Sequence, residues 1–244
     1  MKNFTALSVT LALCAAMTTA SIVTPLHPKA NAASAKEWIQ ISEQATYYGE
    51  ARDDKPNGRG TIQWGTSKQY SGDFVDGIRE GSGKYINEYT EDGLKHKVVY
   101  QGTWKQDQMN GNGTYTHKVT DGEGSVTMNE IQTGTFQKGL LQTGYDVIHA
   151  LADPDFSFTY TSPQETFNIM GGNLNMKASF TKGMVFSADY RKGSIRKSYS
   201  IFPAETAAKQ RKNDADLKYM KSIQNHLNPY IVVFERLSKQ VPLQ

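Results

Sequence analysis

The chain has 244 residues, of which 38% are hydrophobic, 11% aromatic and 21% charged. This aromatic content excludes a disordered or collagen-like chain, and a formal net charge of +3 does not indicate a protein built to neutralise nucleic acid. The length suits one elongated domain or one and a half compact ones. Residues 33–171 carry 12 basic and 19 acidic side chains, whereas residues 172–244 carry 13 and 5. We therefore expect two regions with different surface roles, or two halves that attract each other.

Residues 1–32 have the layout of a secretory signal peptide. Lys2 precedes an apolar run from Phe4 to Ala20, and Ala30-Asn31-Ala32 forms a small-x-small cleavage site. The run is short for a membrane span and is followed by prolines, which favours cleavage over an uncleaved anchor. The sequence predicts a secreted or cell-surface protein that is cleaved near Ala32.

The single cysteine, Cys14, lies inside the apolar run of the predicted signal peptide. Lipid attachment at Cys14 is not expected, because Leu13 is the wrong residue type before a lipoprotein cysteine. After cleavage the chain has no cysteine, so disulfides, thiolate nucleophiles and cysteine-ligated metals are excluded. Packing and sheet hydrogen bonds are then expected to provide the stability.

Residues 47–145 contain a repeated pattern of glycines and aromatic residues. Three segments align without internal gaps, Tyr47–Trp64, Tyr70–Asn87 and Tyr100–His117, and a fourth starts at Gly134 and decays toward Gly144. The positions predicted to be structural are Tyr47, Gly49, Gly58, Gly60, Tyr70, Gly72, Phe74, Gly77, Gly81, Gly83, Tyr85, Tyr100, Gly102, Trp104, Gly111, Gly113, Tyr115, Gly134, Phe136 and Gly139.

The spacing within each copy predicts a β-hairpin. Tyr70, Gly72 and Phe74 are two residues apart and share one face of a strand. The residues Gly81–Tyr85 repeat this spacing after a short turn, where Gly77 suits a positive φ. Glycines weaken a strand unless a ring from a neighbouring strand covers them. One hairpin cannot bury its rings alone, so successive hairpins are expected to stack into one twisted sheet.

This pattern resembles the MORN repeat family, here in an exported bacterial type. The resemblance implies a single-layer antiparallel sheet that binds or arranges other molecules, with protein partners or phospholipid headgroups as ligands and no catalysis by the repeat. The copies start 23 and 30 residues apart rather than evenly, and Ala51 occupies an aromatic position of the first copy. The extra segments Glu88–Lys97 and Val119–Asn129 are expected to extend hairpin ends or loops.

The remaining regions are a lead-in at 33–46, degenerate hairpins at 146–202 and a helical segment at 203–244. Phe156–Tyr160 alternates as a strand does, and Gly171-Gly172 is read as a hairpin turn before a strand over Leu174–Phe180. Phe180–Gly183 and Tyr190–Gly193 each resemble the first half of the repeat. The predicted fold is mainly β: stacked antiparallel hairpin repeats in an elongated twisted sheet, followed by C-terminal α-helices.

The C-terminal segment is predicted to contain two helices. Leu217, Met220, Ile223 and Leu227 fall at helical spacing, and Asn228-Pro229 is read as the start of the second helix. The helices are expected to cap the end of the sheet or to cover its apolar face. The alternative is a basic amphipathic arm that lies on an anionic membrane.

No sequence motif marks a catalytic residue, a metal site or a cofactor. The histidines after residue 32 lack metal-ligand spacing, and His117 is expected to pack as an aromatic ring. Gly-x-Ser-x-Gly and nucleotide-binding patterns are absent from the sequence. The densest basic region supplies the candidate anion-binding residues Arg191, Lys192, Arg196, Lys197, Lys209, Arg211 and Lys212.

The sequence thus predicts a non-catalytic exported protein that presents its sheet to a protein partner or to an anionic lipid or polymer of the cell envelope. Nucleic acid is not an expected partner, and the open sheet edges favour self-association. One alternative is a cell-wall protein that binds carbohydrate or choline on an aromatic platform, although Trp-Tyr pairs do not recur here. Another is a cell-wall hydrolase whose paired carboxylates meet only in the fold.

Overall fold

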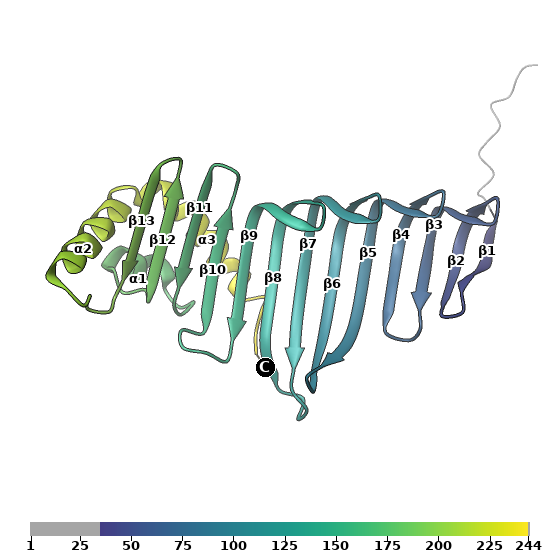
Figure 1. Ribbon diagram of the computed structural model, residues 1–244, viewed down its shortest axis with the longest axis horizontal. Helices are drawn as coiled ribbons and strands as arrows, with labels where there is room; N and C mark the ends of the chain where they lie inside the picture. The colour runs from purple at the N-terminus through teal and green to yellow at the C-terminus, as the bar shows by residue number, and fades with distance from the viewer. Residues whose placement is uncertain (1–34, 244) are drawn as a thin grey trace, which may run out of the picture. The chain divides into compact units, whose positions relative to one another are not determined.

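The computed structural model describes residues 35–243, so the predicted signal peptide and Cys14 lie outside the described residues. The described chain forms one 13-stranded antiparallel sheet in which strand order follows chain order (Figure 1). The strands are β1 (Lys36–Ser42), β2 (Ala45–Arg52), β3 (Lys55–Trp64), β4 (Lys68–Val75), β5 (Ile78–Glu91), β6 (Leu94–Lys105), β7 (Gln108–Thr120), β8 (Val126–Gln137), β9 (Leu140–Ala150), β10 (Phe156–Thr161), β11 (Glu165–Met170), β12 (Ser187–Lys192) and β13 (Ile195–Ser200). The helices are α1 (Met176–Lys182), α2 (Ala207–Ser222) and α3 (Gln224–Ser238). The predicted fold class is confirmed.

Each predicted repeat is a hairpin, and the hairpins pair in a register that aligns equivalent residues. The three copies form β2–β3, β4–β5 and β6–β7, and the decayed fourth copy forms β8–β9. Glycines lie directly opposite one another from strand to strand, as in the pairs Gly72 with Gly83 and Gly102 with Gly113. The extra segments lengthen the strands, because β5 and β6 pair as far as Glu91 and Leu94.

Aromatic rings fill the spaces that the glycines leave. We call these side chains the aromatic core: Tyr47, Ile62, Tyr70, Phe74, Tyr100, Trp104 and Phe136. Tyr100 is fully buried, with its ring edge-on to Trp104 at 5.3 Å and to Phe136 at 5.2 Å. A Cβ atom added at Gly113 would lie 2.6 Å from ring atoms of Tyr100, so this position accepts no side chain without displacing the ring. Ring-over-glycine packing therefore stabilises this face of a single-layer sheet.

The hairpin turns of the repeats use left-handed backbone conformations. Gly77 has a φ of 86°, and the aspartates at the equivalent positions, Asp54 and Asp107, have φ values of 57° and 63°. Aspartate tolerates this region better than most residues because its short polar side chain can bond to nearby backbone. The sequence interpretation of these turns is confirmed.

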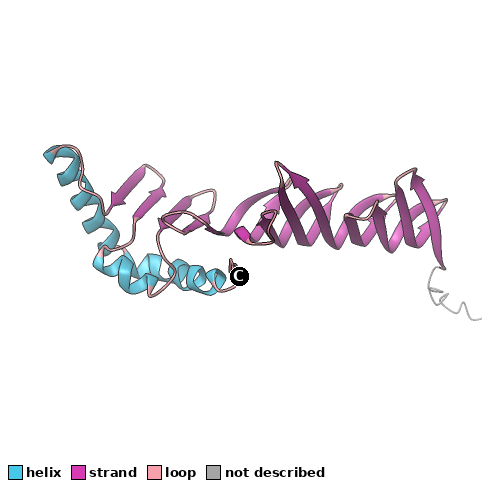
Figure 2. Ribbon diagram, turned by 90° about the horizontal axis from the view of Figure 1, so that it is seen from below, coloured by secondary structure: helices cyan, strands magenta, loops and turns pink. Residues whose placement is uncertain are grey.

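A second hydrophobic cluster, the C-terminal core, lies on the opposite face of the sheet. Along β8, Phe136 belongs to the aromatic core, whereas Ile131, of opposite parity in the strand, packs with Val147 in the C-terminal core. Helices α2 and α3 cover this second face and contribute Met220 and Phe234 among other buried residues. Figure 2 shows the helices gathered on one side of the last strands. The helices cover the apolar face of the sheet, which is one of the two arrangements expected for them.

The predicted strand over Leu174–Phe180 is wrong, and so is the reading of Phe180–Gly183 as a worn repeat half. Helix α1 occupies this segment. Met176 and Phe180 are buried four residues apart on one helix face, whereas Leu174 is 82% exposed, which a strand with alternating burial would not allow. Tyr190–Gly193 does belong to a hairpin, β12–β13.

Two further boundaries differ from the sequence prediction. Helix α3 begins at Gln224 rather than at Asn228-Pro229, and Pro229 lies inside it. The buried stripe of α3 already includes Leu227, so packing against the sheet extends the helix across the proline. The predicted lead-in at 33–46 contains β1, which pairs with β2.

Candidate anion-binding site

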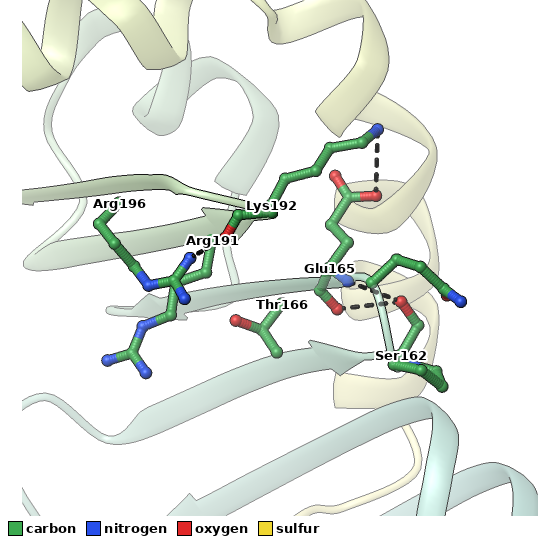
Figure 3. A pocket seen from close by; sticks show the side chains of 9 residues that line it. Ser162, Glu165, Thr166, Arg191, Lys192 and Arg196 are labelled. Atoms are coloured by element: carbon green, nitrogen blue, oxygen red, sulfur yellow. Dashed lines mark hydrogen bonds and ion pairs between the residues drawn. The ribbon is translucent and has the colours of Figure 1, made fainter.

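A cavity of about 490 Å³ lies at the ends of β11, β12 and β13, where two hairpin loops meet. Figure 3 shows the side chains that surround it. The lining residues with polar side chains are Ser162, Gln164, Glu165, Thr166, Arg191, Lys192 and Arg196. Three of the seven predicted anion-binding residues, Arg191, Lys192 and Arg196, thus line one cavity together.

The strand register places two guanidinium groups side by side. Arg191 lies directly opposite Arg196 across β12 and β13, and opposite Thr166 across β11 and β12. Like charges directly opposite each other are destabilising. Among the partners that the structure describes, Arg196 donates hydrogen bonds only to the backbone carbonyls of Gly193 and Ile195, at 2.7 and 2.9 Å. Within residues 35–243, Arg191 forms no ion pair, so the positive charge of this pair is uncompensated.

Lys192 extends to the other side of the strand, toward Glu165 (Figure 3). Its Nζ atom lies 3.8 Å from a carboxylate oxygen of Glu165. Glu165 is only 8% exposed and accepts hydrogen bonds from His226 at 2.5 Å and from Tyr230 at 3.1 Å. This network joins the cavity wall to helix α3.

The pKa of Glu165 is lowered from its ordinary value. Burial acts to raise it, but hydrogen bonds from His226 and from the hydroxyls of Tyr190 and Tyr230 outweigh the effect of burial. Glu165 is therefore an anion at neutral pH. It compensates Lys192 but lies on the opposite side of the strand from Arg191 and Arg196, whose charges remain directed to the cavity.

The other four predicted anion-binding residues belong to different surroundings. Lys197 and Lys212 both bind the carboxylate of Asp216, at 2.9 and 2.7 Å. Asp216 is 2% exposed, and its ion pair with Lys197 attaches α2 to β13. Lys209 pairs with Glu205 on the surface at 2.5 Å. Arg211, also in α2, is exposed and lies outside the cavity. The predicted basic cluster is therefore several local arrangements rather than one site.

Sequence reasoning missed the hydroxyls of Ser162 and Thr166 and the Glu165–His226 pair. A run of basic residues in the sequence indicates only the strands that contain it. The hydroxyls and Glu165 come from the preceding hairpin, and His226 comes from α3.

A second group of titratable side chains lies on the aromatic-core face, across β6 to β9. His117 stacks on His96 at 5.2 Å, as expected for a packed ring, and lies 3.8 Å from Glu130. Gln132 donates hydrogen bonds to Glu130 at 2.7 Å and to Asp146 at 3.3 Å. Burial, followed by the charge of Glu130, raises the pKa of Asp146 to about 7.

These two carboxylates are the pair that a hydrolase would need, and they line a cavity of about 660 Å³. The amide group of Gln132 lies between them and donates a hydrogen bond to each carboxylate. Glycoside hydrolysis requires carboxyl groups roughly 5 to 9.5 Å apart, so that a sugar and water fit between them. Here the amide group of Gln132 occupies the space between the two carboxylates, so this arrangement does not support the hydrolase alternative.

Among residues 35–243, no group of three or more histidine, cysteine or acidic side chains is arranged to hold a metal ion. No helix in the same range combines the length and the apolar character needed to span a bilayer.

Comparison with known proteins identifies the repeats. The MORN repeat model matches residues 47–68, 70–87 and 100–118. Alsin of Rattus norvegicus is 34% identical over 108 residues, which is 42% of this chain and 6% of Alsin. Alsin of Homo sapiens is 33% identical over the same length. The ALS2 C-terminal-like protein of Homo sapiens is 29% identical over 119 residues, 48% of this chain and 11% of that protein.

The chain therefore contains MORN repeats, and these repeats suggest a non-catalytic binding or scaffold role. The chain spans only 6% to 11% of the length of the relatives named above. Those relatives are mammalian, so the comparison supports the repeat but not an exported bacterial type.

Proposed function

We propose that this protein is an exported binding or scaffolding protein of the cell envelope, which holds an anionic lipid headgroup or polymer in the cavity at Arg191 and Arg196. The observation that carries the proposal is the pair of opposed guanidinium groups beside the hydroxyl of Thr166. Guanidinium groups bind phosphate and carboxylate oxygens with two parallel hydrogen bonds. An anion between Arg191 and Arg196 would also relieve their mutual repulsion.

The sheet serves this function as a rigid platform. Thirteen strands in uninterrupted order present the cavity near one end and leave the other end for a protein partner. Export rests on the signal-like pattern of residues 1–32. Self-association through the unpaired edge of β1 stays a prediction.

The test is sedimentation of the purified protein with anionic vesicles and, separately, with purified cell wall. The variant Arg191→Glu/Arg196→Glu removes both guanidinium groups. The control, Arg211→Glu/Lys218→Glu, makes the same change of charge on exposed residues of α2 outside the cavity.

We expect binding to one of the two materials, weaker at high salt, and lost in the cavity variant but kept in the control. The vesicle and cell-wall arms distinguish a lipid from a polymer. Salt-independent absence of binding to both would refute the envelope role, and equal loss in both variants would refute the cavity as the site.

A further inference from the structure

A pair of exposed aromatic rings lies at the N-terminal end of the sheet. Trp38 of β1 is 75% exposed and Tyr48 of β2 is 42% exposed. Their ring centroids are 4.8 Å apart with an interplanar angle of 33°. The neighbouring Tyr47 is completely buried in the aromatic core, so Tyr48 projects from the opposite face. The two rings thus pack on each other at a tilt outside the aromatic core, and most of Trp38 stays open to solvent.

Polar side chains continue from this pair across the sheet in one row. Each residue lies directly opposite the next on the neighbouring strand, so all project from one face. We call this set the polar row: Trp38, Tyr48, Thr61, Ser71, Lys84 and Gln101. Neighbouring strands are about 4.8 Å apart. The row therefore offers one polar side chain at each regular step beyond the two rings, with the hydroxyls of Thr61 and Ser71 hydrogen-bonded to each other at 2.8 Å.

The polar row borders two adjoining cavities. The first, of about 530 Å³, is lined by Tyr48, Glu50, Arg59 and Thr61 among others. The second, of about 420 Å³, contains Lys84, Gln101 and Asn112. Arg59 and Ser71 line both cavities, so the two form one shallow groove that crosses the strands.

The charges around the first cavity are balanced. Lys36 lies directly opposite Glu50 on the neighbouring strand. Arg59 Nε lies 3.5 Å from a carboxylate oxygen of Asp73. The surrounding region, residues 33–171, carries 12 basic and 19 acidic side chains and would repel an anionic ligand. Apart from the exposed Lys84 in the second cavity, the charged side chains of the groove thus lie beside opposite charges, and the groove complements an uncharged ligand that is rich in hydrogen-bonding groups.

We propose that the groove along the polar row binds a neutral polysaccharide, whose terminal sugar ring packs against the exposed Trp38–Tyr48 pair at the end of the groove. The apolar face of a sugar packs on an aromatic ring, and its hydroxyls are donors and acceptors for Thr61, Ser71 and Gln101. An extended glycan repeats its rings at nearly the spacing of adjacent strands, so it keeps step with the row. This site is separate from the anion cavity and does not depend on it.

The rings and the groove also decide between sugar and choline. Recognition of a quaternary ammonium uses an aromatic cage that surrounds the cation. Trp38 and Tyr48 pack on each other rather than forming a cage, and the adjoining walls are polar. Choline is accordingly a competitor in the test and not the proposed ligand.

The experiment measures retention of the full chain on insoluble cellulose and chitin, and its affinity for cellohexaose and chitohexaose by calorimetry. Trp38→Ala removes the larger stacking ring, and Trp38→Phe keeps an aromatic ring in its place. Phe202→Ala is the matched control, since Phe202 is a 53% exposed aromatic residue outside the groove.

We expect binding to one of the two glycans, about tenfold weaker in Trp38→Ala and nearly unchanged in Trp38→Phe and Phe202→Ala. Added salt should leave this binding intact, which distinguishes it from anion binding at Arg191 and Arg196. The proposal is overturned if neither polymer retains the protein, if Trp38→Ala binds as well as the wild type, or if choline chloride displaces the glycan.

Discussion

Replacing Gly113 by alanine tests the ring-over-glycine packing that the whole repeat region depends on. The backbone of Gly113 does not have a positive φ, so the methyl group itself is the perturbation. It would lie 2.6 Å from two ring carbons of Tyr100, which is closer than Cβ atoms approach any neighbour. The ring cannot move freely, because it is fully buried between Trp104 and Phe136.

The expected cost follows from the contacts that the ring would lose. Overpacking of a buried site costs about 1–3 kcal/mol. Displacement of Tyr100 also lengthens the hydrogen bond from its hydroxyl to the carbonyl of Thr103, now 3.1 Å, worth about 1 kcal/mol. Alanine recovers roughly 0.5–1 kcal/mol of strand propensity over glycine. We expect Gly113→Ala to lower the free energy of unfolding by about 2–3 kcal/mol.

Urea unfolding followed by tryptophan fluorescence measures this change, since Trp104 contacts Tyr100 directly. Gly122→Ala is the matched control, because a Cβ there meets no atom within 4 Å. A double variant with Tyr100→Leu should cost less than the sum of its single changes, as expected for two groups that clash. A stability for Gly113→Ala within about 0.5 kcal/mol of the control would refute the packing argument.

Two further predictions concern buried carboxylates. The raised pKa of Asp146, about 7, means that its protonated form stabilises the fold and that this contribution is lost as pH rises from about 4 to 7. The free energy of unfolding of Asp146→Asn, measured in urea between pH 4 and 7, should therefore decline by up to about 4 kcal/mol less than that of the wild type. Asp92→Asn is the control, and the prediction is contradicted if wild type, control and Asp146→Asn all lose stability equally with pH. Glu165 has a lowered pKa, so its contribution is present above its unfolded value of 4.5 and is lost on acidification. Glu165→Gln should cost about 2–3 kcal/mol at pH 7 and less below pH 4; an equal cost at both pH values would show that ionisation of Glu165 is irrelevant.

The repeat architecture could be predicted because its signal is local and recurs. Tyr70, Gly72 and Phe74 determine a strand face, and copies at fixed offsets reveal the pairing between strands. β1 was not predicted, because it lies outside the repeat copies and no second copy reveals its pairing with β2. α1 is only seven residues long, and the apolar residues Leu174 to Phe180 fit an alternation of two as well as a helical period. The helix is favoured over the strand by the packing of α1 against α3, which the local sequence does not show.

The candidate site was only partly predictable for a similar reason. Arg191 and Arg196 are marked by the charge of their own hairpin. The buried Asp216 that neutralises Lys197 and Lys212 comes from α2, which packs back against β13. A count of charges along the chain cannot distinguish a cation held by a distant carboxylate from one that faces an open cavity.

The two hydrophobic cores on opposite faces of one sheet have a mechanical consequence. β8 and β9 carry residues of both cores, with Phe136 and Leu141 on one face and Ile131 and Val147 on the other. β1, by contrast, is exposed along nearly its whole length. Under tension applied between the ends of the sheet, β1 would detach first. The β8–β9 hairpin, which is packed on both faces, would be the last part to unfold.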